Sequence, residues 1–296
     1  MNHHELISAL TPLHGAGEAR AIVRMVMEER FGLSQTDLLL GKDTDLSAND
    51  RTEFEKIARR LLAGEPVQHV LGYAYFYGHR FRVTPDVLIP RPETEELVRW
   101  STDVSSCAAH PAPLRILDLC TGSGCIAISL ALAYPDADVC AVDLSEPALA
   151  IARENALTLG ANNVCFFQGD VLSFDHFMQS QSALPAVFDL ITANPPYVRE
   201  SEATGIHPTV LNHEPSLALF VPDEDPLRFY RAIAQIGLRA LTPGGHILAE
   251  INTDLPAETS QIFSQFNYTS IEVRNDQFGR PRMIKAERIG PHKNEK

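Results

Sequence analysis

Long apolar runs are missing from this chain of 296 residues. No stretch approaches the roughly 18 consecutive apolar residues that a transmembrane helix needs, so no membrane-spanning segment is expected. The start of the chain, Met-Asn-His-His-Glu, also lacks the basic and apolar regions of a secretory signal peptide. We therefore expect a cytoplasmic protein with no membrane partner.

Cysteine is scarce as well, with five residues, and no two of them form a C-x-x-C pair. The odd number argues against a disulfide framework, and the lack of such pairs argues against a structural zinc site. The eleven histidines show no ligand spacing such as H-x-x-x-H. No metal is therefore expected, and free thiols agree with a reducing cytosol.

Basic residues are in the minority, because 25 Lys and Arg stand against 38 Asp and Glu, for a formal net charge of −13. Proteins that bind nucleic acid non-specifically neutralise phosphates with Lys and Arg, so no direct nucleic-acid substrate is expected. A hydrophobic content of 45% and a charged content of 21% are those of an ordinary globular protein and exclude wholesale disorder. The length predicts about two domains.

The apolar pattern divides the chain into three parts. Residues 1–72 carry apolar side chains at helical spacing and predict a small helical bundle, in which Ser47 is a helix N-cap. Residues 73–92 begin with an aromatic, strand-like stretch and predict a connecting β-hairpin. Residues 93–296 form the third part, where the Ser-, Ala- and Pro-rich segment Ser101–Pro113 predicts a surface loop.

From residue 114 onward, short apolar runs alternate with helical patterns, which predicts an α/β fold with a mostly parallel sheet. The predicted strands are Arg115–Leu119, Val139–Leu144, Val164–Gly169, Phe188–Ala193, His246–Ile251, Ser270–Val273 and Arg282–Glu287. The predicted helices are Cys125–Tyr134, Glu146–Leu159, Pro226–Leu241 and Pro256–Phe266.

A glycine-containing loop follows the first of these strands and leads directly into a helix. It runs Cys120-Thr121-Gly122-Ser123-Gly124. Glycines let the backbone turn sharply and approach a ligand closely, so these five residues are candidates for cofactor binding. The third glycine of a dinucleotide fingerprint is absent, and the loop alone is weak evidence.

An acidic residue, Asp143, ends the second strand, about 20 residues after the loop. A carboxylate at that place can accept hydrogen bonds from both hydroxyls of a ribose. The alternative is that Asp143 caps the next helix, a role that Ser145 or Glu146 could also fill. Together the loop and Asp143 indicate a nucleoside cofactor, either NAD or S-adenosylmethionine.

The tetrapeptide Asn194-Pro195-Pro196-Tyr197 follows the fourth strand, and strand carboxyl ends line the ligand crevice in such sheets. The prolines stiffen the turn and donate no N–H, so the Asn194 side-chain oxygen and the Pro195 carbonyl remain as acceptors. Tyr197 adds a flat wall. Such a site suits a planar amide or amine nitrogen held by its two N–H bonds. The alternative is an Asx-Pro turn beside an aromatic core residue.

Asn-Pro-Pro-Tyr at this place resembles the amino-methyltransferases that use S-adenosylmethionine. The match then extends over residues 15–290 and resembles, more narrowly, the peptide chain release factor glutamine methyltransferases, the PrmC/HemK family. The segments that carry this resemblance are Gly64–Gly72, Leu88–Glu95, His213–Leu219 and Phe278–Arg282.

The resemblance implies a Rossmann-like S-adenosylmethionine-dependent methyltransferase domain with a mostly parallel seven-stranded sheet. It implies methyl transfer to the side-chain amide nitrogen (N5) of the glutamine in the Gly-Gly-Gln loop of class 1 release factors, with S-adenosylhomocysteine as product. The helical part would help to bind this protein substrate. A monomer is expected.

The resemblance also implies a role for each site residue. Cys120 to Gly124 would pass under the methionine part of the cofactor, Asp143 would hold the ribose, and Asp170 and Val171 would flank the adenine. The catalytic and substrate-binding residues would be Asn194, Pro195, Pro196 and Tyr197. Asn194 would also bind the cofactor. Asp118 would reach the ligand or brace the loop, and Arg91, Glu93 and Thr94 would shape or gate the pocket.

This chain departs from the family pattern at three positions. Cys120 stands where many members have glycine, and its side chain is expected to point away from the cofactor. Val171 stands where many members have an aromatic residue beside the adenine. Asn252 stands where a glycine often follows the pair Glu250-Ile251.

Three alternatives remain open. An N6-adenine nucleic-acid methyltransferase shares the Asn-Pro-Pro-Tyr motif but needs a basic surface. A glutamine methyltransferase of a ribosomal protein tends to carry Arg-Ser-Pro where this chain has Arg91-Pro92. A non-catalytic binding module would not need the intact motifs. The locally basic segment 274–296 is interpreted as a solvated tail rather than an RNA footprint.

Overall fold

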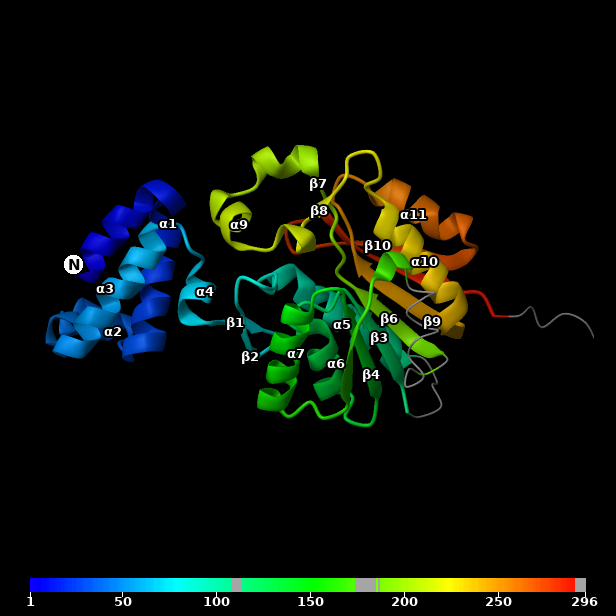
Figure 1. The fold of residues 1–296 in the computed structure, drawn as a ribbon, viewed down its shortest axis with the longest axis horizontal. Coiled ribbons are helices and arrows are strands. Elements are labelled where there is room, and N and C mark those ends of the chain that lie inside the picture. Colours follow the sequence, from blue (N-terminus) through cyan, green and yellow to red (C-terminus); the bar gives the residue numbers. More distant parts are fainter. Residues whose placement is uncertain (108–112, 174–184, 186, 291–296) are drawn as a thin grey trace, which may run out of the picture. The chain divides into compact units, whose positions relative to one another are not determined.

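The structure, a computed structural model, describes residues 1–107, 113–173, 185 and 187–290 (Figure 1). Contacts divide the chain into two compact units. The N-terminal unit comprises Met1–Tyr73, Val83–Pro85 and Ile206–Glu214, and the sheet unit comprises the rest. The boundaries expected at residues 72 and 92 stay a prediction.

The N-terminal unit contains the predicted helices. They are α1 (His3–Phe31), α2 (Gln35–Leu39), α3 (Ala48–Leu62) and α4 (Val67–Leu71), with a 3-10 turn, η1 (Lys42–Asp45). Helix α1 breaks at Gly15, which has φ 78° and ψ 158°. The predicted N-cap is confirmed, because the Ser47 hydroxyl accepts the Asp50 N–H at 3.1 Å. Apolar side chains of α1 and α3, such as Val23 and Phe54, form the core of this unit.

The segment Ile206–Glu214, distant in sequence, also belongs to the N-terminal unit. It contains α9 (Pro208–His213). The ring of His207 stacks on that of His14 with centroids 5.5 Å apart. The same histidine caps α9 and contacts the Leu13 carbonyl at 3.2 Å. Nothing in the local pattern of this segment predicted that association.

The sheet unit is built on seven strands, and the predicted α/β class is confirmed. Their order is β10-β11-β9-β6-β3-β4-β5. Strand β11 is antiparallel to both of its neighbours, while β9, β6, β3, β4 and β5 run parallel. The strands are β3 (Arg115–Leu119), β4 (Asp138–Asp143), β5 (Val164–Gln168), β6 (Phe188–Ala193), β9 (Leu241–Glu250), β10 (Tyr268–Asn275) and β11 (Pro281–Arg288).

Helices cover both faces of this sheet, which explains why its strands read as continuous apolar runs (Figure 1). The flanking helices are α5 (Pro92–Cys107), α6 (Cys125–Ala133), α7 (Glu146–Leu159), α10 (Arg228–Ala240) and α11 (Pro256–Gln265). Leu117 and Leu119 of β3 pack toward α10 and α11, whereas Ile116 packs toward α5 and α6.

The predicted hairpin is present as β1 (Tyr73–Phe76) and β2 (His79–Arg82). Its two turn residues, Tyr77 and Gly78, both have positive φ, as a two-residue hairpin turn of the primed type requires. The hairpin is tied to the sheet unit, because Tyr77 N–H donates to the Glu95 carboxylate at 2.9 Å.

Two sequence predictions about secondary structure are wrong. The expected loop Ser101–Pro113 is helical through Cys107, because α5 continues past the buried Trp100 and Ser101; residues 108–112 lie outside the described part. The basic segment 274–296 is not a solvated tail as far as residue 288, since it contains the end of β10 and all of β11. The guanidinium of Arg274, for instance, lies 4.1 Å from the centre of the Trp100 ring. Residues 291–296 lie outside the described part.

Short elements between β6 and α10 were also missed by periodicity. Strands of two residues carry too little pattern to be recognised. The elements are β7 (Val198–Arg199), β8 (Phe220–Val221), which pairs parallel with β7, and the 3-10 turns η3 (Glu200–Gly205) and η4 (Ser216–Ala218).

Candidate active site

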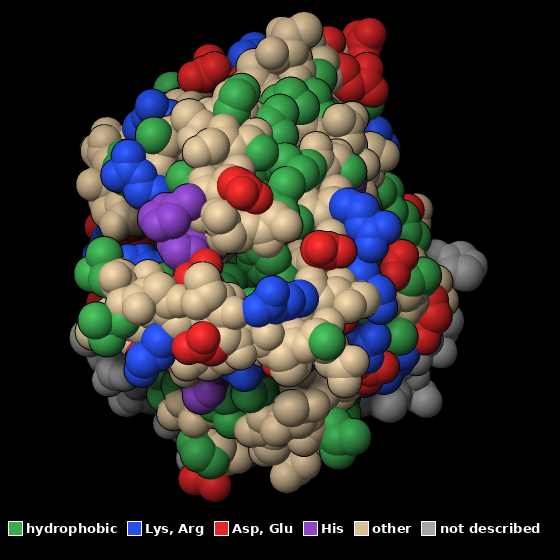
Figure 2. Space-filling view, turned by 90° about the vertical axis from the view of Figure 1, so that its left-hand side faces the viewer, with side chains coloured by type: hydrophobic (Ala, Val, Ile, Leu, Met, Phe, Trp, Pro, Cys, Tyr) green, Lys and Arg blue, Asp and Glu red, His purple; other side chains and the backbone are tan. Residues whose placement is uncertain are grey.

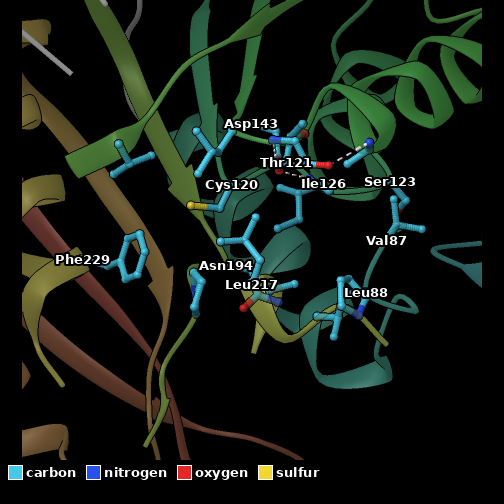
Figure 3. Close-up of a pocket in the computed structure, with 18 of the residues that line it drawn as sticks. Val87, Leu88, Cys120, Thr121, Ser123, Ile126, Asp143, Asn194, Leu217 and Phe229 are labelled. Atoms are coloured by element: carbon cyan, nitrogen blue, oxygen red, sulfur yellow. Dashed lines mark hydrogen bonds between the residues drawn. The ribbon is translucent and has the colours of Figure 1, made fainter. Parts of the chain in front are cut away.

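A pocket of about 330 Å³ lies in the sheet unit, at the carboxyl ends of β3, β4, β5 and β6. This is the edge at which open α/β sheets bind ligands. The loops after these strands meet there although they are distant in sequence (Figure 3). The predicted residues that line the pocket are Arg91, Thr94, Cys120, Thr121, Gly122, Ser123, Asp143, Asp170, Val171, Asn194 and Pro196.

The loop after β3 needs glycine at Gly124 for packing rather than for ligand contact. This residue has φ 81° and is not among the pocket-lining residues. A Cβ there would lie 2.8 Å from Ile128 Cδ1 and 3.1 Å from Ala152 Cβ. Gly122, by contrast, lines the pocket and donates its N–H to Asp143 at 2.8 Å. Backbone of this loop therefore forms part of the pocket wall.

Cys120 occupies a left-handed conformation with φ 59°, which non-glycine residues adopt at some cost. The expectation that its side chain points away from the ligand is wrong. Cys120 lines the pocket, and Figure 3 shows its sulfur directed toward the space beside Phe229 and Asn194. Burial holds the pKa of this thiol well above its ordinary value, so the side chain is a neutral, apolar part of the wall.

Asp118 braces the loop instead of reaching the ligand. Its two carboxyl oxygens accept the hydroxyls of Thr121 at 2.6 Å and Thr192 at 2.7 Å, and it is fully buried. Burial raises the pKa of Asp118 to about 7, because water no longer solvates the charge. It is not among the pocket-lining residues. The structure thus favours the bracing alternative.

Asp143 lies in the pocket wall, and each of its two carboxylate oxygens accepts one hydrogen bond. Oδ2 accepts Gly122 N–H at 2.8 Å and Oδ1 accepts Ser145 N–H at 2.9 Å. Burial raises the pKa of Asp143, whereas these backbone donors lower it. Capping of α7 falls to Ser145, whose hydroxyl accepts Ala148 N–H at 3.2 Å. Each Asp143 oxygen retains acceptor capacity, as binding of two ribose hydroxyls requires.

The far wall combines two residues expected from the sequence, Asp170 and Val171, with others that the sequence had not singled out. Val171 is buried and Asp170 turns the backbone, since its Oδ1 accepts Leu172 N–H at 2.8 Å. The ring of Phe229 in α10 lies on one side of the pocket, opposite Val87 and Leu88 (Figure 3). Other such lining residues include Leu144, Ala148, Pro215, Leu217, Ala218, Phe220 and Arg228.

The Asn-Pro-Pro-Tyr turn divides between the pocket and the protein interior. Asn194 and Pro196 line the pocket, whereas Pro195 and Tyr197 are not among its lining residues. The Tyr197 hydroxyl donates to Glu250 at 3.3 Å. The amide nitrogen of Asn194 donates to Thr94 Oγ1 at 3.4 Å, and Thr94 donates in turn to Glu250. Sequence reasoning had quoted Glu250 only as part of a motif.

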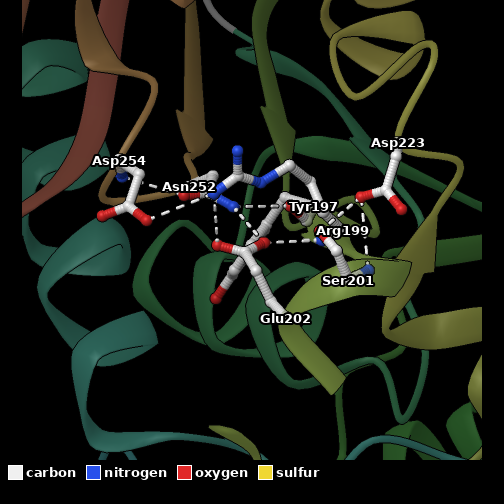
Figure 4. Close-up of polar contacts among 7 residues, drawn as sticks. All are labelled: Tyr197, Arg199, Ser201, Glu202, Asp223, Asn252 and Asp254. Carbon is white, nitrogen blue, oxygen red and sulfur yellow. Dashed lines mark hydrogen bonds and ion pairs between the residues drawn. The ribbon is translucent and has the colours of Figure 1, made fainter. Parts of the chain in front are cut away.

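A polar cluster holds the outer part of this turn (Figure 4). Asn252 donates to the Tyr197 carbonyl at 2.9 Å and to Glu202 at 3.1 Å. Arg199 contacts Glu202 at 3.0 Å and Asp254 at 3.4 Å. The departure from glycine at position 252 therefore supplies a side chain that supports the turn.

Within the ranges that the structure describes, no group of three or more His, Cys, Asp and Glu side chains could hold a metal ion. Among the same residues, no helix combines the length and the apolar character that crossing a bilayer requires. Hydroxyl, carboxylate, guanidinium, thiol, amide and apolar groups line the pocket.

Comparison with known proteins agrees with this architecture. A family model described as a methyltransferase domain matches residues 112–286, and one described as the PrmC N-terminal domain matches residues 6–72. The N-terminal domain of human METTL16 in complex with SAH is similar in fold, with a TM-score of 0.52 and 14% identity. That likeness covers 71% of this chain and 76% of the other.

Similarity in sequence extends over nearly the whole chain. The release factor glutamine methyltransferase of Bacteroides thetaiotaomicron is 44% identical over 280 residues, which cover 95% of this chain and 96% of the relative. The enzyme of the same name from Flavobacterium psychrophilum is 38% identical over 282 residues, with the same coverage. Because identity at this level spans both units and the pocket, the chain belongs to the family of release factor glutamine methyltransferases.

Proposed function

We propose that this protein transfers a methyl group from S-adenosylmethionine to the side-chain amide nitrogen (N5) of the glutamine in the Gly-Gly-Gln loop of class 1 release factors. The observation that carries the proposal is the position of Asn194. Its amide lies in the same pocket wall as the glycine-containing loop and Asp143. An acceptor for a substrate amide and a candidate ribose-binding carboxylate thus share one pocket.

The residues present fit S-adenosylmethionine. Acceptor capacity on Asp143 suits ribose hydroxyls, and the apolar wall of Val171, Leu172 and Phe229 suits the adenine. Backbone of Cys120 to Ser123 suits the polar methionine end. When bound, this cofactor supplies a methyl group that its sulfonium has already activated.

Binding and orientation are the tasks left to the chain itself. An amide nitrogen is a poor nucleophile because its lone pair is delocalised. We propose that Asn194 Oδ1 and the Pro195 carbonyl accept its two N–H bonds, which would orient the nitrogen and increase its electron density. Positioning of this kind contributes roughly 7–11 kcal/mol at best. The excess proton of the product can leave to water, so no general base is assigned.

Charge supports a protein rather than a nucleic acid as substrate. The chain carries a net charge of −13. On the face that Figure 2 draws, basic side chains lie interspersed with acidic ones instead of forming one continuous track. We further propose that the N-terminal unit binds the release factor, as its match to the PrmC N-terminal domain supports.

The test is a methyl-transfer assay with labelled S-adenosylmethionine and a purified release factor, run in parallel with the Gln→Ala variant of its loop. We expect label on the wild-type factor alone. An Asn194→Ala variant should lose turnover while it still binds the cofactor in calorimetry. No label on either factor, with intact cofactor binding, would overturn the proposal and direct the search to ribosomal protein and then to nucleic acid.

A further inference from the structure

A buried carboxyl group, Glu250, lies behind the candidate catalytic amide at the end of β9. It is 2% exposed. Its Oε1 accepts the Thr94 hydroxyl, and its Oε2 accepts the Tyr197 hydroxyl at 3.3 Å. Thr94 Oγ1 in turn accepts the side-chain N–H of Asn194 at 3.4 Å. Glu250, Thr94 and Asn194 therefore form one chain of hydrogen bonds that ends in the pocket.

Which group donates and which accepts in these hydrogen bonds follows from the number of hydrogens that each side chain carries. A threonine hydroxyl has a single hydrogen, and an ionised carboxylate can only accept. The Thr94 hydrogen is thus committed to Glu250, and only lone pairs of Oγ1 remain toward Asn194. A flipped Asn194 would place its carbonyl oxygen against those lone pairs. The NH₂ group must face Thr94, so the oxygen faces the other way.

We propose that Glu250 is a positioning residue for methyl transfer, which acts through Thr94 to hold the Asn194 amide with its oxygen toward the substrate. This inference rests on the proposed function, in which that oxygen accepts an N–H of the substrate glutamine. Without the constraint, both orientations of the Asn194 amide become available. The flipped orientation points the NH₂ group of Asn194 at the N–H of the substrate glutamine, so no hydrogen bond forms between them.

Protonation of Glu250 removes the constraint. A carboxylic acid can donate to Thr94, which frees the Thr94 hydrogen for the Asn194 oxygen and allows the flip. Burial raises the pKa of Glu250 to about 7, so the change falls within the range in which the enzyme can be assayed. The groups around this carboxyl are Thr94 and Glu93 of α5, Cys125 of α6, Tyr197 after β6, Tyr230 of α10 and Arg282 of β11.

Two substitutions at Thr94 and a control at Thr259 separate this role from packing. Thr94→Val keeps the shape of the side chain but removes the hydroxyl, and we expect kcat to fall about tenfold, the value of one hydrogen bond. The cofactor Kd from calorimetry should change less than twofold. Thr94→Ser should restore most of the lost kcat. The matched control is Thr259→Val in α11, whose buried hydroxyl donates to Leu255 at 2.7 Å away from the pocket; kcat should not change.

Glu250→Gln supplies the second readout. Wild-type kcat should rise with pH through an apparent pKa near 7, and this step should be absent in the variant, whose kcat should be low at every pH. Thermal unfolding checks that each variant is folded. If Glu250→Gln fails to fold, the Thr94 pair still decides the question.

Three results would overturn the inference. The first is a kcat of Thr94→Val equal to that of the wild type. The second is a loss of kcat that Thr94→Ser does not restore. The third is a kcat loss in Thr259→Val equal to that in Thr94→Val, which would indicate a general effect of stability. In each case wild-type transfer to the glutamine would leave the proposed function standing. An inactive wild type would instead refute the proposed function and the inference together.

Discussion

The side-chain amide of Asn252 donates a hydrogen bond of 2.9 Å to the main-chain carbonyl of Tyr197. A residue shortly after the end of β9 thereby holds the turn that follows β6. Asn252 is buried, and its side-chain oxygen Oδ1 accepts the main-chain N–H of Asp254 at 2.8 Å. The support for the candidate catalytic turn thus comes from a neighbouring strand end.

Asn252→Ala should lower both stability and kcat. Loss of these hydrogen bonds should cost about 1–3 kcal/mol in the free energy of unfolding, since the partly buried carbonyl of Tyr197 loses its partner. Looser positioning of Asn194 should lower kcat at saturating substrate. The matched control is Asn163→Ala, because Asn163 also donates to main-chain carbonyls, those of Ala131, Tyr134 and Ala137. That variant should lose stability only. Equal kcat in both variants would contradict the prediction.

Asp143→Asn should weaken cofactor binding at least about tenfold, because an amide loses the charge and one of the two acceptor oxygens. Calorimetry with S-adenosylmethionine measures the change in Kd. Asp189→Asn serves as the control, since Asp189 is buried and accepts Arg115 N–H at 3.0 Å but does not line the pocket. It should destabilise the chain without changing Kd. An unchanged Kd in Asp143→Asn would refute the assigned role.

Cys120→Gly should stabilise the chain by up to about 1 kcal/mol, because glycine adopts φ 59° without strain. Cys140→Gly is the comparison, since Cys140 is a buried residue within β4 and glycine weakens a strand interior. Thermal unfolding should show shifts of opposite sign for the two variants. A lower midpoint for Cys120→Gly would show that packing of the sulfur outweighs the backbone strain.

Asp118 should make the folded state less stable as pH rises from about 4 to about 7. Burial raises the pKa of Asp118 to about 7, so within this window the folded chain holds a proton that the unfolded chain has released. Between pH 5 and pH 8, the wild type should lose on the order of 1–3 kcal/mol more stability than Asp118→Asn. Urea unfolding at the two pH values measures this difference.

The control for that experiment is Asp138→Asn, which alters an exposed carboxyl at the start of β4. This variant should follow the wild-type pH dependence. If Asp118→Asn follows it as well, the buried carboxyl does not titrate in this window.

Much of the sheet unit was predictable because its strands are buried on both faces. The apolar residues of runs such as Arg115–Leu119 and Phe188–Ala193 contribute to both cores, and the predicted bounds match β3 and β6. The segment Ser101–Pro113 was predicted as a loop because it is rich in serine, although Trp100 and Ser101 of α5 are buried. Composition predicted this helix end poorly, because packing against the core stabilises a helix even where the local sequence is rich in serine.

The site was predictable in its pieces. Loops after β3, β4 and β6 carried recognisable residues, because a turn that approaches a ligand requires glycine, carboxylate or proline at given places. Phe229, Leu88 and the Thr94–Glu250 pair were not predictable, since each is an ordinary residue within its own helix or loop. No local signal distinguishes Glu250 from any other strand-terminal acid.

By itself the sequence determined the alternation of strands and helices, the family and several of the residues that meet at the carboxyl edge of the sheet. Only the tertiary structure decided how those residues are held. Asn194 and Thr94 are 100 residues apart in the chain, and Thr94 and Glu250 are 156 apart. They contact one another because the order of the strands places β9 beside β6 and packs α5 against both. Hydrogen bonds between such distant groups depend on that packing, and no local pattern encodes them.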